Sequence, residues 1–245
     1  GESEAQIQLT DFISHKADHY EDSNDPGLNL TSYLSMYLHF GMISPIDIYL
    51  SLEAAVKKGT IRPSAFAAFI EQLIIRRELA INYVMFHPGY DRFETMTESW
   101  AYLTMREHDQ DARPVLYDLA SLEAGVTADV YFNAAMREMV LTGYMHNYMR
   151  MYWAKKIIEW TPSHQEAYRI ILFLNNKYFL DGRDPNSYTG IAWCFGKHDR
   201  PWTERNVFGK LRYMNQAGLL RKFKMDAYLK RIAELERLNE TSKNS

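Results

Sequence analysis

Apolar residues recur at intervals of three and four positions along nearly the whole chain, which is the period of an amphipathic helix. Neither sustained two-residue alternation nor a two-residue hairpin turn occurs, so the pattern predicts an all-α fold. The stretch Ser44-Pro45-Ile46-Asp47 is typical of a helix start, with a serine cap and a proline at the first helical position. It begins a predicted helix that ends near Lys58-Gly59.

The same spacing predicts a long helix that Pro63 opens and that runs through Phe86. Later helices are predicted over 98–107, 128–141, 145–160, 163–178, 203–214 and 225–237. Between two of them, Asp181-Gly182-Arg183-Asp184-Pro185-Asn186 has the composition of a turn, and we expect a loop there that carries function. The chain then divides into an acidic lead-in (1–19), a helical domain (20–238) and a frayed tail (239–245).

Composition limits the class of protein. An apolar fraction of 47% in 245 residues is enough for one substantial core. No stretch approaches the roughly 20 apolar residues of a membrane span, and the polar N-terminus lacks a secretory signal, so we expect a cytoplasmic protein. The single cysteine, Cys194, excludes an internal disulfide and every CxxC metal site. The histidines are dispersed, and neither HExxH nor another paired His/Cys metal spacing occurs, so no metal is predicted; no Rossmann or Walker motif occurs either.

Charge is distributed unevenly, although the net charge is only −3. The segment 197–231 holds ten Lys and Arg against three acids, whereas residues 1–30 hold seven acids and one lysine. A basic stretch of this kind can contact the phosphate backbone of a nucleic acid. A charged run is more often a solvated face, and both interpretations stay open at this point.

Two further segments contain candidate chemistry. The segment 31–41 sets a run of hydroxyls ahead of an apolar helix, a start that can seat a phosphate group or serve as an ordinary helix cap. On the predicted helix 145–160, Trp153 and Trp160 are seven residues apart and share one face, at about 10 Å from each other. Such a pair can relay an electron or can be core packing. Arg150 lies on nearly the same face, and Asp181 is a candidate partner for its charge.

The segment 180–202 combines aromatic residues with Arg and Lys, among them Trp193, Lys197, Arg200 and Trp202. Aromatic rings can stack on an unpaired base while the cations contact the phosphates of the strand. The combination is typical of a surface that binds a nucleic-acid strand.

Taken in order and with their spacing, the segments 145–160 and 180–202 resemble class II cyclobutane pyrimidine dimer (CPD) photolyases. The segment 31–41 resembles the TSxLSPYLHFG stretch of the wider photolyase/cryptochrome superfamily. Residues 71–79 with Asn82 resemble a signature helix, and 87–91 resemble the loop after it. The resemblance extends over residues 20–228. It implies the helical, FAD-binding catalytic domain of that family, without the antenna domain that normally precedes it.

The resemblance implies FAD as the cofactor, folded into a U shape among the helices. The residues implied to contact it are Tyr20, Thr31, Ser32, Leu34, Ser35, Arg77, Asn147, Arg150, Asn175 and Asp181. Arg150 and Asp181 would form an ion pair beside the flavin ring, and Asn175 would face flavin N5. Trp153 and, further along, Trp160 would carry the electron that reduces the flavin.

The resemblance also implies damaged DNA as the partner of a monomeric enzyme, near the nucleoid or in a eukaryotic nucleus. Light would excite the reduced flavin, and one electron would pass to a pyrimidine dimer that has left the base stack. Gln72 would contact the dimer as a catalytic residue. The other residues implied to contact the dimer or the DNA are Arg76, Met151, Trp193, Lys197, Arg200, Trp202 and Arg212.

Several positions depart from the family pattern. Gln72 stands in place of a glutamate that hydrogen-bonds the dimer, and Phe132 stands in place of a tryptophan on the electron route. Met36 replaces a proline, and the segment 23–26 lacks an arginine before Asn-Asp-Pro. These changes keep open a second hypothesis, a cryptochrome-like FAD protein that repairs no DNA, and a third, a remnant that binds no flavin.

Overall fold

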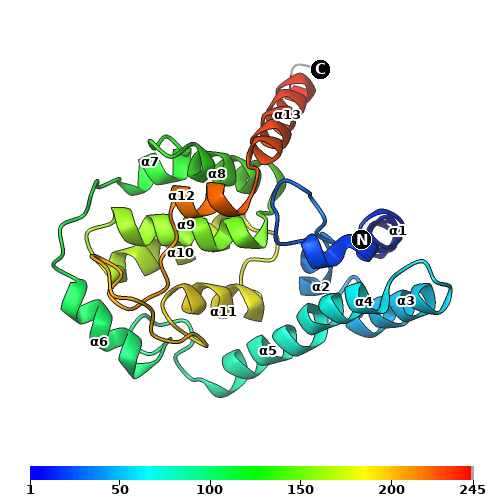
Figure 1. Ribbon diagram of the computed structural model, residues 1–245, viewed down its shortest axis with the longest axis horizontal. Coiled ribbons are helices and arrows are strands. Elements are labelled where there is room, and N and C mark those ends of the chain that lie inside the picture. The colour runs from blue at the N-terminus through cyan, green and yellow to red at the C-terminus, as the bar shows by residue number, and fades with distance from the viewer. Residues whose placement is uncertain (244–245) are drawn as a thin grey trace.

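The computed structural model describes residues 1–243, and within that range the chain is helical (Figure 1). The described residues contain no strand, only an isolated antiparallel bridge between Arg205 and Gly209. The predicted all-α fold is therefore confirmed. The helices are α1 (Glu2–His15), α2 (Ser35–His39), α3 (Pro45–Lys57), α4 (Pro63–Ile70), α5 (Arg77–Phe86), α6 (Ser99–His108), α7 (Leu119–Ala124), α8 (Val130–Thr142), α9 (Asn147–Trp160), α10 (His164–Tyr178), α11 (Pro185–Cys194), α12 (Gln216–Lys222) and α13 (Asp226–Lys243), with a 3-10 helix at Ala17–Asp22 and a π-helix at Glu71–Arg76.

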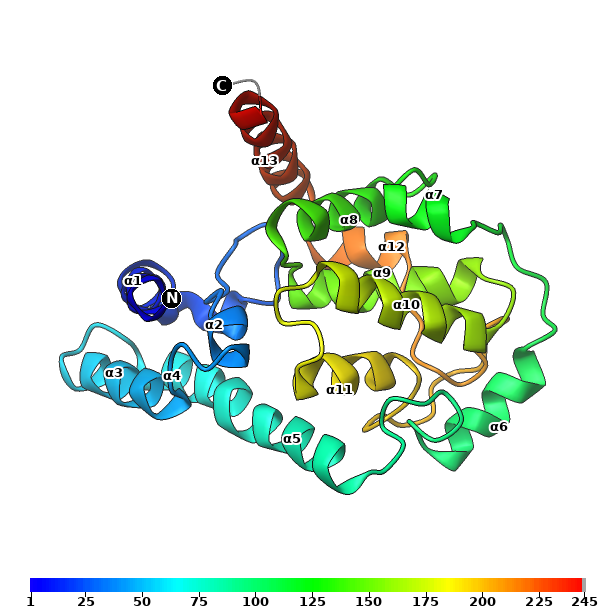
Figure 2. The ribbon, with the colours of Figure 1, turned by 180° about the vertical axis from the view of Figure 1, so that it is seen from behind.

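Buried apolar side chains form two clusters, one in each lobe of the molecule. The N-terminal lobe consists of α1 to α4 with the turns between them, and its core includes Leu9, Phe12 and Leu52. The C-terminal lobe consists of α6 to α13 around a larger core that includes Trp153 and Ile171. In Figures 1 and 2 the two lobes lie side by side, and α5 runs along the C-terminal lobe and packs against α11.

The long helix predicted over 63–86 is confirmed as a continuous run of α4, the π-helix and α5. Pro63 stands in its first turn, where a missing backbone N–H leaves no intrahelical bond unmade. A π-helix inserts one extra residue into a turn and is frequent at functional sites. Here it lies where the run leaves the core of one lobe and reaches that of the other.

The helices predicted over 98–107, 128–141, 145–160, 163–178 and 225–237 correspond to α6, α8, α9, α10 and α13, and the predicted start at Ser44 is that of α3. Ser163 caps α10, because its Oγ accepts from the N–H of Glu166 at 3.1 Å. The helix predicted over 203–214 is wrong. Its apolar residues Val207 and Phe208 are buried in a loop, so their spacing reflected burial and not helical periodicity.

Both ends of the described chain are helical. The lead-in predicted for residues 1–19 forms α1, which contributes buried side chains to the N-terminal lobe. The tail predicted to fray from residue 239 stays helical as far as Lys243, while residues 244 and 245 lie outside the described range. In Figure 1, α13 projects from the body of the C-terminal lobe. No helix within residues 1–243 is long and apolar enough to cross a membrane.

Candidate functional site

A cavity of about 320 Å³ lies between the two lobes, and all ten residues predicted to contact a cofactor line it. They are Tyr20, Thr31, Ser32, Leu34, Ser35, Arg77, Asn147, Arg150, Asn175 and Asp181. The lining also includes four other predicted site residues, namely Gln72, Arg76, Met151 and Trp153. The remaining predicted residues lie outside the lining: Trp160, Trp193, Lys197, Arg200, Trp202 and Arg212. The fold thus brings together side chains that are far apart in the sequence.

The N-terminal wall of the cavity consists of Tyr20, residues 31–35 and Arg77. The backbone of residues 31–35 is irregular: Tyr33 has a φ of +56°, and Gln8 donates to the carbonyl oxygen of Ser32 at 2.9 Å. The helix predicted to follow the hydroxyl run is α2, which has only five residues. The hydroxyls themselves, rather than the dipole of a long helix, are therefore the main donors of this segment.

Three donors of the N-terminal wall are unused. The Oγ1 of Thr31, the Oγ of Ser35 and the Nε of Arg77 are buried, and none has a hydrogen-bond partner within residues 1–243. A buried donor without a partner is costly, so native structures rarely keep one without a reason. These atoms are therefore the best candidates for direct contact with a polar ligand in the cavity.

One face of the long helix continues this wall toward solvent. Phe69 and Leu73 are buried, whereas Gln72 and Arg76 on the same lining are exposed. The guanidinium carbon of Arg76 lies 5.8 Å from the ring centre of Trp193 on α11. The cavity therefore changes from an apolar interior to a polar and aromatic rim.

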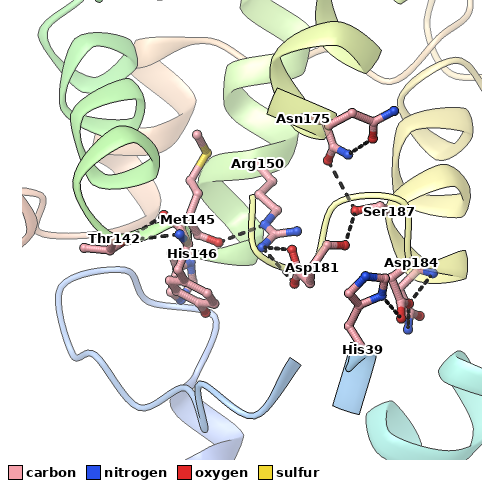
Figure 3. Close-up of polar contacts among 12 residues, drawn as sticks. His39, Thr142, Met145, His146, Arg150, Asn175, Asp181, Asp184 and Ser187 are labelled. Carbon is pink, nitrogen blue, oxygen red and sulfur yellow. Dashed lines mark hydrogen bonds and ion pairs between the residues drawn. The ribbon is translucent and has the colours of Figure 1, made fainter. Parts of the chain in front are cut away.

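The C-terminal wall consists of Arg150, Asn175, Asp181 and Ser187, and it contains the ion pair that the sequence predicted (Figure 3). Arg150 on α9 donates from Nη2 to both carboxylate oxygens of Asp181, at 2.9 and 3.1 Å. Its guanidinium carbon also lies 3.9 Å from the ring centre of Phe179. Both charged side chains are largely buried, so each charge needs the opposite charge to offset the cost of its removal from water. The loop predicted over 181–186 is shorter than expected, because α11 already begins at Pro185.

Asn175 is joined to this ion pair through Ser187 (Figure 3). The Oγ of Ser187 lies 3.3 Å from Oδ1 of Asn175 and 3.0 Å from the carbonyl oxygen of Asp181. On its other side, Nδ2 of Asn175 donates to Oδ1 of Asn176 at 2.9 Å. Asn175 is only 3% exposed, so its amide is held in one orientation.

Two histidines connect the lobes. Nδ1 of His39, at the end of α2, lies 3.3 Å from Oδ2 of Asp184, which caps α11. His146 caps α9, where its Nδ1 accepts from the N–H of Tyr148 at 3.2 Å, and its Nε2 donates to the carbonyl oxygen of Ser23 at 2.8 Å. Burial lowers the pKa of His146 from 6.5 to about 4. The ring therefore stays neutral at physiological pH and keeps the lone pair that the cap requires.

Both tryptophans of α9 are buried, but of the two only Trp153 lines the cavity. Its indole N–H points at Sδ of Met136, at 2.9 Å. Trp160 packs edge-on against Phe132 and Tyr117, and both ring-centre distances are 5.2 Å. Phe132, the position where the family pattern has a tryptophan, is therefore in contact with Trp160.

Trp202 lies between two guanidinium groups on the loop 199–212. Its ring centre is 5.5 Å from the guanidinium carbon of Arg200 and 4.6 Å from that of Arg212. Asp199 accepts from the indole N–H at 3.2 Å and pairs with Arg212 at 3.3 Å. Trp202 remains 39% exposed, so the loop presents an aromatic ring flanked by two cations to solvent. Lys197 is different, because it is mostly buried and pairs with a glutamate at 2.7 Å.

Several residues that complete the site were not among those predicted from the sequence. Tyr144 and Phe179 flank the Arg150 guanidinium, and Ser187 connects Asn175 to Asp181. Their partners are distant in sequence, so no local spacing identifies them. Residues 1–243 contain no group of three or more metal-ligating side chains placed to hold a metal ion.

Comparison with known proteins finds relatives that match more than nine-tenths of this chain. No protein-family model matches it. It is 48% identical to the deoxyribodipyrimidine photo-lyase of Methanothermobacter thermautotrophicus over 236 residues, which is 96% of this chain and 51% of that protein. It is 46% identical to the deoxyribodipyrimidine photo-lyase of Arabidopsis thaliana over 227 residues, which is 91% of this chain and 45% of that protein. The chain therefore spans about half the length of these curated relatives.

Solved structures share the fold. A class III photolyase from Agrobacterium tumefaciens superposes with a TM-score of 0.72 at 20% identity, over 95% of this chain and 44% of that one. A cryptochrome from Synechocystis superposes with a TM-score of 0.68 at 18% identity, over 94% of this chain and 44% of that one. An archaeal photolyase from Sulfolobus tokodaii, described with two FAD molecules, superposes with a TM-score of 0.63 at 19% identity. The match covers 96% of this chain and 46% of that one. The chain has the fold of the helical domain of the photolyase/cryptochrome family, as the sequence predicted.

Proposed function

We propose that this chain, whose fold is that of the photolyase/cryptochrome helical domain, binds FAD and repairs CPDs in DNA as part of a class II photolyase. The observation that carries the proposal is the cavity between the lobes, which is lined by all ten residues expected to contact the cofactor. The names of the curated relatives support the reaction. We also propose that the protein acts as a monomer, in the cytoplasm near the nucleoid or in the nucleus of a eukaryote.

The cavity suits a flavin dinucleotide in two respects. The N-terminal wall offers the unused donors of Ser35 and Arg77, which fit the oxygens of a pyrophosphate or ribityl chain. The opposite side offers apolar surface beside the Arg150–Asp181 pair, where Trp153, Ile171 and Ile191 can pack against a flat ring. Donors on one side and apolar surface on the other match a molecule with a charged centre and an aromatic end.

A bound flavin would supply light absorption and the transferable electron. The residues of the chain fix the ring and set the electric field around it. Arg150, balanced by Asp181, places a paired charge beside the ring, where exclusion of water strengthens its effect. Asn175 presents an amide that neighbouring side chains hold on both sides, so it can hydrogen-bond a ring edge without reorganising.

The proposed DNA contacts form two groups. Gln72 and Met151 line the cavity and would meet a dimer that has left the base stack. Arg200, Trp202 and Arg212 form the exposed group on the loop 199–212, where the ring would stack in the gap and the cations would contact phosphates. The first group would hold the lesion, and the second would hold the opened duplex.

The test has two steps. An absorption spectrum of the purified protein should show a bound flavin, and its absence would remove the proposal together with every role assigned to the cavity. The reduced holoprotein is then illuminated with an oligonucleotide that contains a thymine dimer, and the remaining dimer is measured by chromatography against a dark control. We expect the dimer to disappear only in light. A flavin-bearing protein that leaves the dimer intact would contradict repair.

A flavin-binding relative that repairs no DNA is the second candidate, and Gln72 and Phe132 favour it. A glutamine cannot carry the charge or the proton of a glutamate, and phenylalanine is much harder to oxidise than tryptophan. The variant Gln72→Glu separates the candidates: a photolyase should repair at least as fast with the carboxyl group, whereas a non-repairing protein should leave dimers intact in both forms. The flavin spectrum of the variant is the control, since the substitution lies at the exposed rim.

A further inference from the structure

The loop 199–212 combines an exposed tip with a buried base. Trp202 and its flanking arginines face solvent, whereas Val207, Phe208 and Leu211 are each 2% exposed or less. Its two sides pair through the two backbone hydrogen bonds between Arg205 and Gly209, and the N–H of Trp202 donates to the carbonyl oxygen of Lys210 at 2.8 Å. A loop without regular structure is therefore anchored in the core of the C-terminal lobe.

The base of this loop contains a residue in an unfavourable conformation. Val207 has a φ of +68°, in the left-handed region that a β-branched residue strongly disfavours. Both of its backbone groups are held from outside the loop. Its N–H donates to Oδ2 of Asp111 at 2.9 Å, and its carbonyl oxygen accepts from Nε2 of His164 at 2.8 Å. The surrounding structure thus imposes a conformation that the loop would not adopt alone.

Further contacts hold the loop on either side of Val207. His108 lies 2.6 Å from Oδ2 of Asp111 and 3.3 Å from Oε1 of Glu204, which belongs to the loop. At Gly209, where φ is +51°, a Cβ would lie 2.1 Å from Oγ1 of Thr104. The loop is therefore held by side chains at the end of α6, in the turn after it and at the first residue of α10.

We propose that His164 and Asp111 are positioning residues that hold the loop 199–212 in its DNA-binding shape before DNA arrives. The inference rests on the proposed function, because it assigns the loop the task of filling the gap that an extruded dimer leaves. Ordering a loop and its side chains during binding weakens affinity, and a loop that is already ordered avoids this loss. At Val207 the two hydrogen bonds from outside the loop hold the backbone in a strained conformation, and we infer that the shape of the loop is set there.

The test compares two forms of one ligand. His164→Leu removes the donor to Val207 together with the 3.2 Å contact between Nδ1 and Asp109, and His164→Gln keeps a donor near the same place. The flavin-loaded proteins are titrated with an oligonucleotide containing one thymine dimer, either single-stranded or annealed to its complement. We expect His164→Leu to bind the duplex about tenfold more weakly and the single strand within about twofold of the wild type, because only the duplex has a gap to fill. His164→Gln should restore most of the duplex affinity.

Hydrogen exchange of the same proteins without DNA gives a second, independent readout. Amides of residues 199–212 should exchange faster in His164→Leu, while those of α9 should not change. Tyr228→Phe is the matched control, since it also removes one buried hydrogen bond, at 2.8 Å, but in the junction between α8 and α13. If His164→Leu is too unstable to purify, Gly209→Ala disturbs the same base from within the loop.

Equal losses of affinity for both forms of the ligand, or unchanged exchange in the loop, would overturn the inference. An undamaged duplex of the same sequence is titrated alongside, because failure of the proposed function has a different signature: the wild-type protein would then bind the damaged and undamaged duplexes equally. The two failures are therefore distinguishable in one set of titrations.

Discussion

The two walls of the cavity differ in whether their polar groups already have partners. On the C-terminal wall, Arg150, Asp181 and Ser187 bond within the chain. On the N-terminal wall, the Oγ of Ser35 and the Nε of Arg77 have no partner within residues 1–243. Both walls line one cavity, so burial alone does not account for the difference.

The contrast indicates which wall is complete before a ligand binds. In a satisfied network, moving one member leaves the others unpaired, so the network resists rearrangement. A wall with spare donors gains interactions only when a ligand provides acceptors, and that gain stabilises the folded state by mass action. We infer that the C-terminal wall fixes the position of the flavin ring and that the N-terminal wall contributes more of the binding strength.

The largest expected effect comes from breaking the C-terminal wall. Asp181→Asn leaves the Arg150 charge largely buried without a counter-charge, and we expect the free energy of unfolding of the flavin-free protein to fall by about 3 kcal/mol. Urea denaturation measures it. The control is Glu166→Gln, which breaks an exposed ion pair with Arg169 and should cost no more than about 0.5 kcal/mol. Equal effects of the two variants would mean that the wall is not a coupled network.

Lowering the pH should weaken the connection between the lobes at His146. The unfolded chain binds a proton there at a pKa near 6.5, whereas burial holds the pKa of folded His146 near 4. Between these values the unfolded state binds more protons, so the free energy of unfolding should fall by about 3 kcal/mol in total as the pH drops from 6.5 to 4. Above pH 6.5 this contribution should not change.

The variant His146→Asn isolates this contribution, since asparagine can still cap α9 but does not titrate. Denaturation curves at several pH values should show a flatter pH dependence for the variant than for the wild type between pH 6.5 and 4. Parallel pH profiles would show that other groups cause the acid sensitivity.

A matched pair of serines gives the smallest and sharpest test. Ser187→Ala removes a used hydroxyl and should lower the free energy of unfolding of the flavin-free protein by about 1 kcal/mol. Ser35→Ala removes an unused one, and its stability should change by less than about 0.5 kcal/mol. Flavin affinity, measured by fluorescence titration, should instead fall about fivefold in Ser35→Ala. Loss of stability without loss of flavin affinity in Ser35→Ala would reverse our assignment of the walls.

Local sequence signals identified most helices, because caps and prolines act within a few residues of where they stand. Ser44, Pro63 and Ser163 each stand where a helix begins. The same reasoning failed over 203–214, where tertiary contacts bury Val207 and Phe208. The backbone there is held by the hydrogen bonds of Val207 to Asp111 and His164 and does not follow a helical period. Whether an apolar run is a helix or a buried loop depends on partners that are distant in sequence.

The residues of the candidate site could be predicted where they belong to a family motif. Residues whose role is to position another residue of the site could not be predicted. All ten expected cofactor contacts line the cavity, and Arg150 does bond to Asp181. The link through Ser187 and the connection from His146 to Ser23 lie outside any motif. Such contacts exist only once the chain has folded, so a sequence can supply the functional groups but not the network that orients them.

Helix α10 has one end at each of the two proposed places of action. His164, its first residue, bonds to Val207 in the loop 199–212, and Asn175, near its last turn, lies in the cavity wall. They are eleven positions apart on the helix, a length of about 16 Å that cannot stretch or shorten without breaking backbone hydrogen bonds. The helix therefore sets a constant spacing between the part that would grip the duplex and the part that would face the flavin.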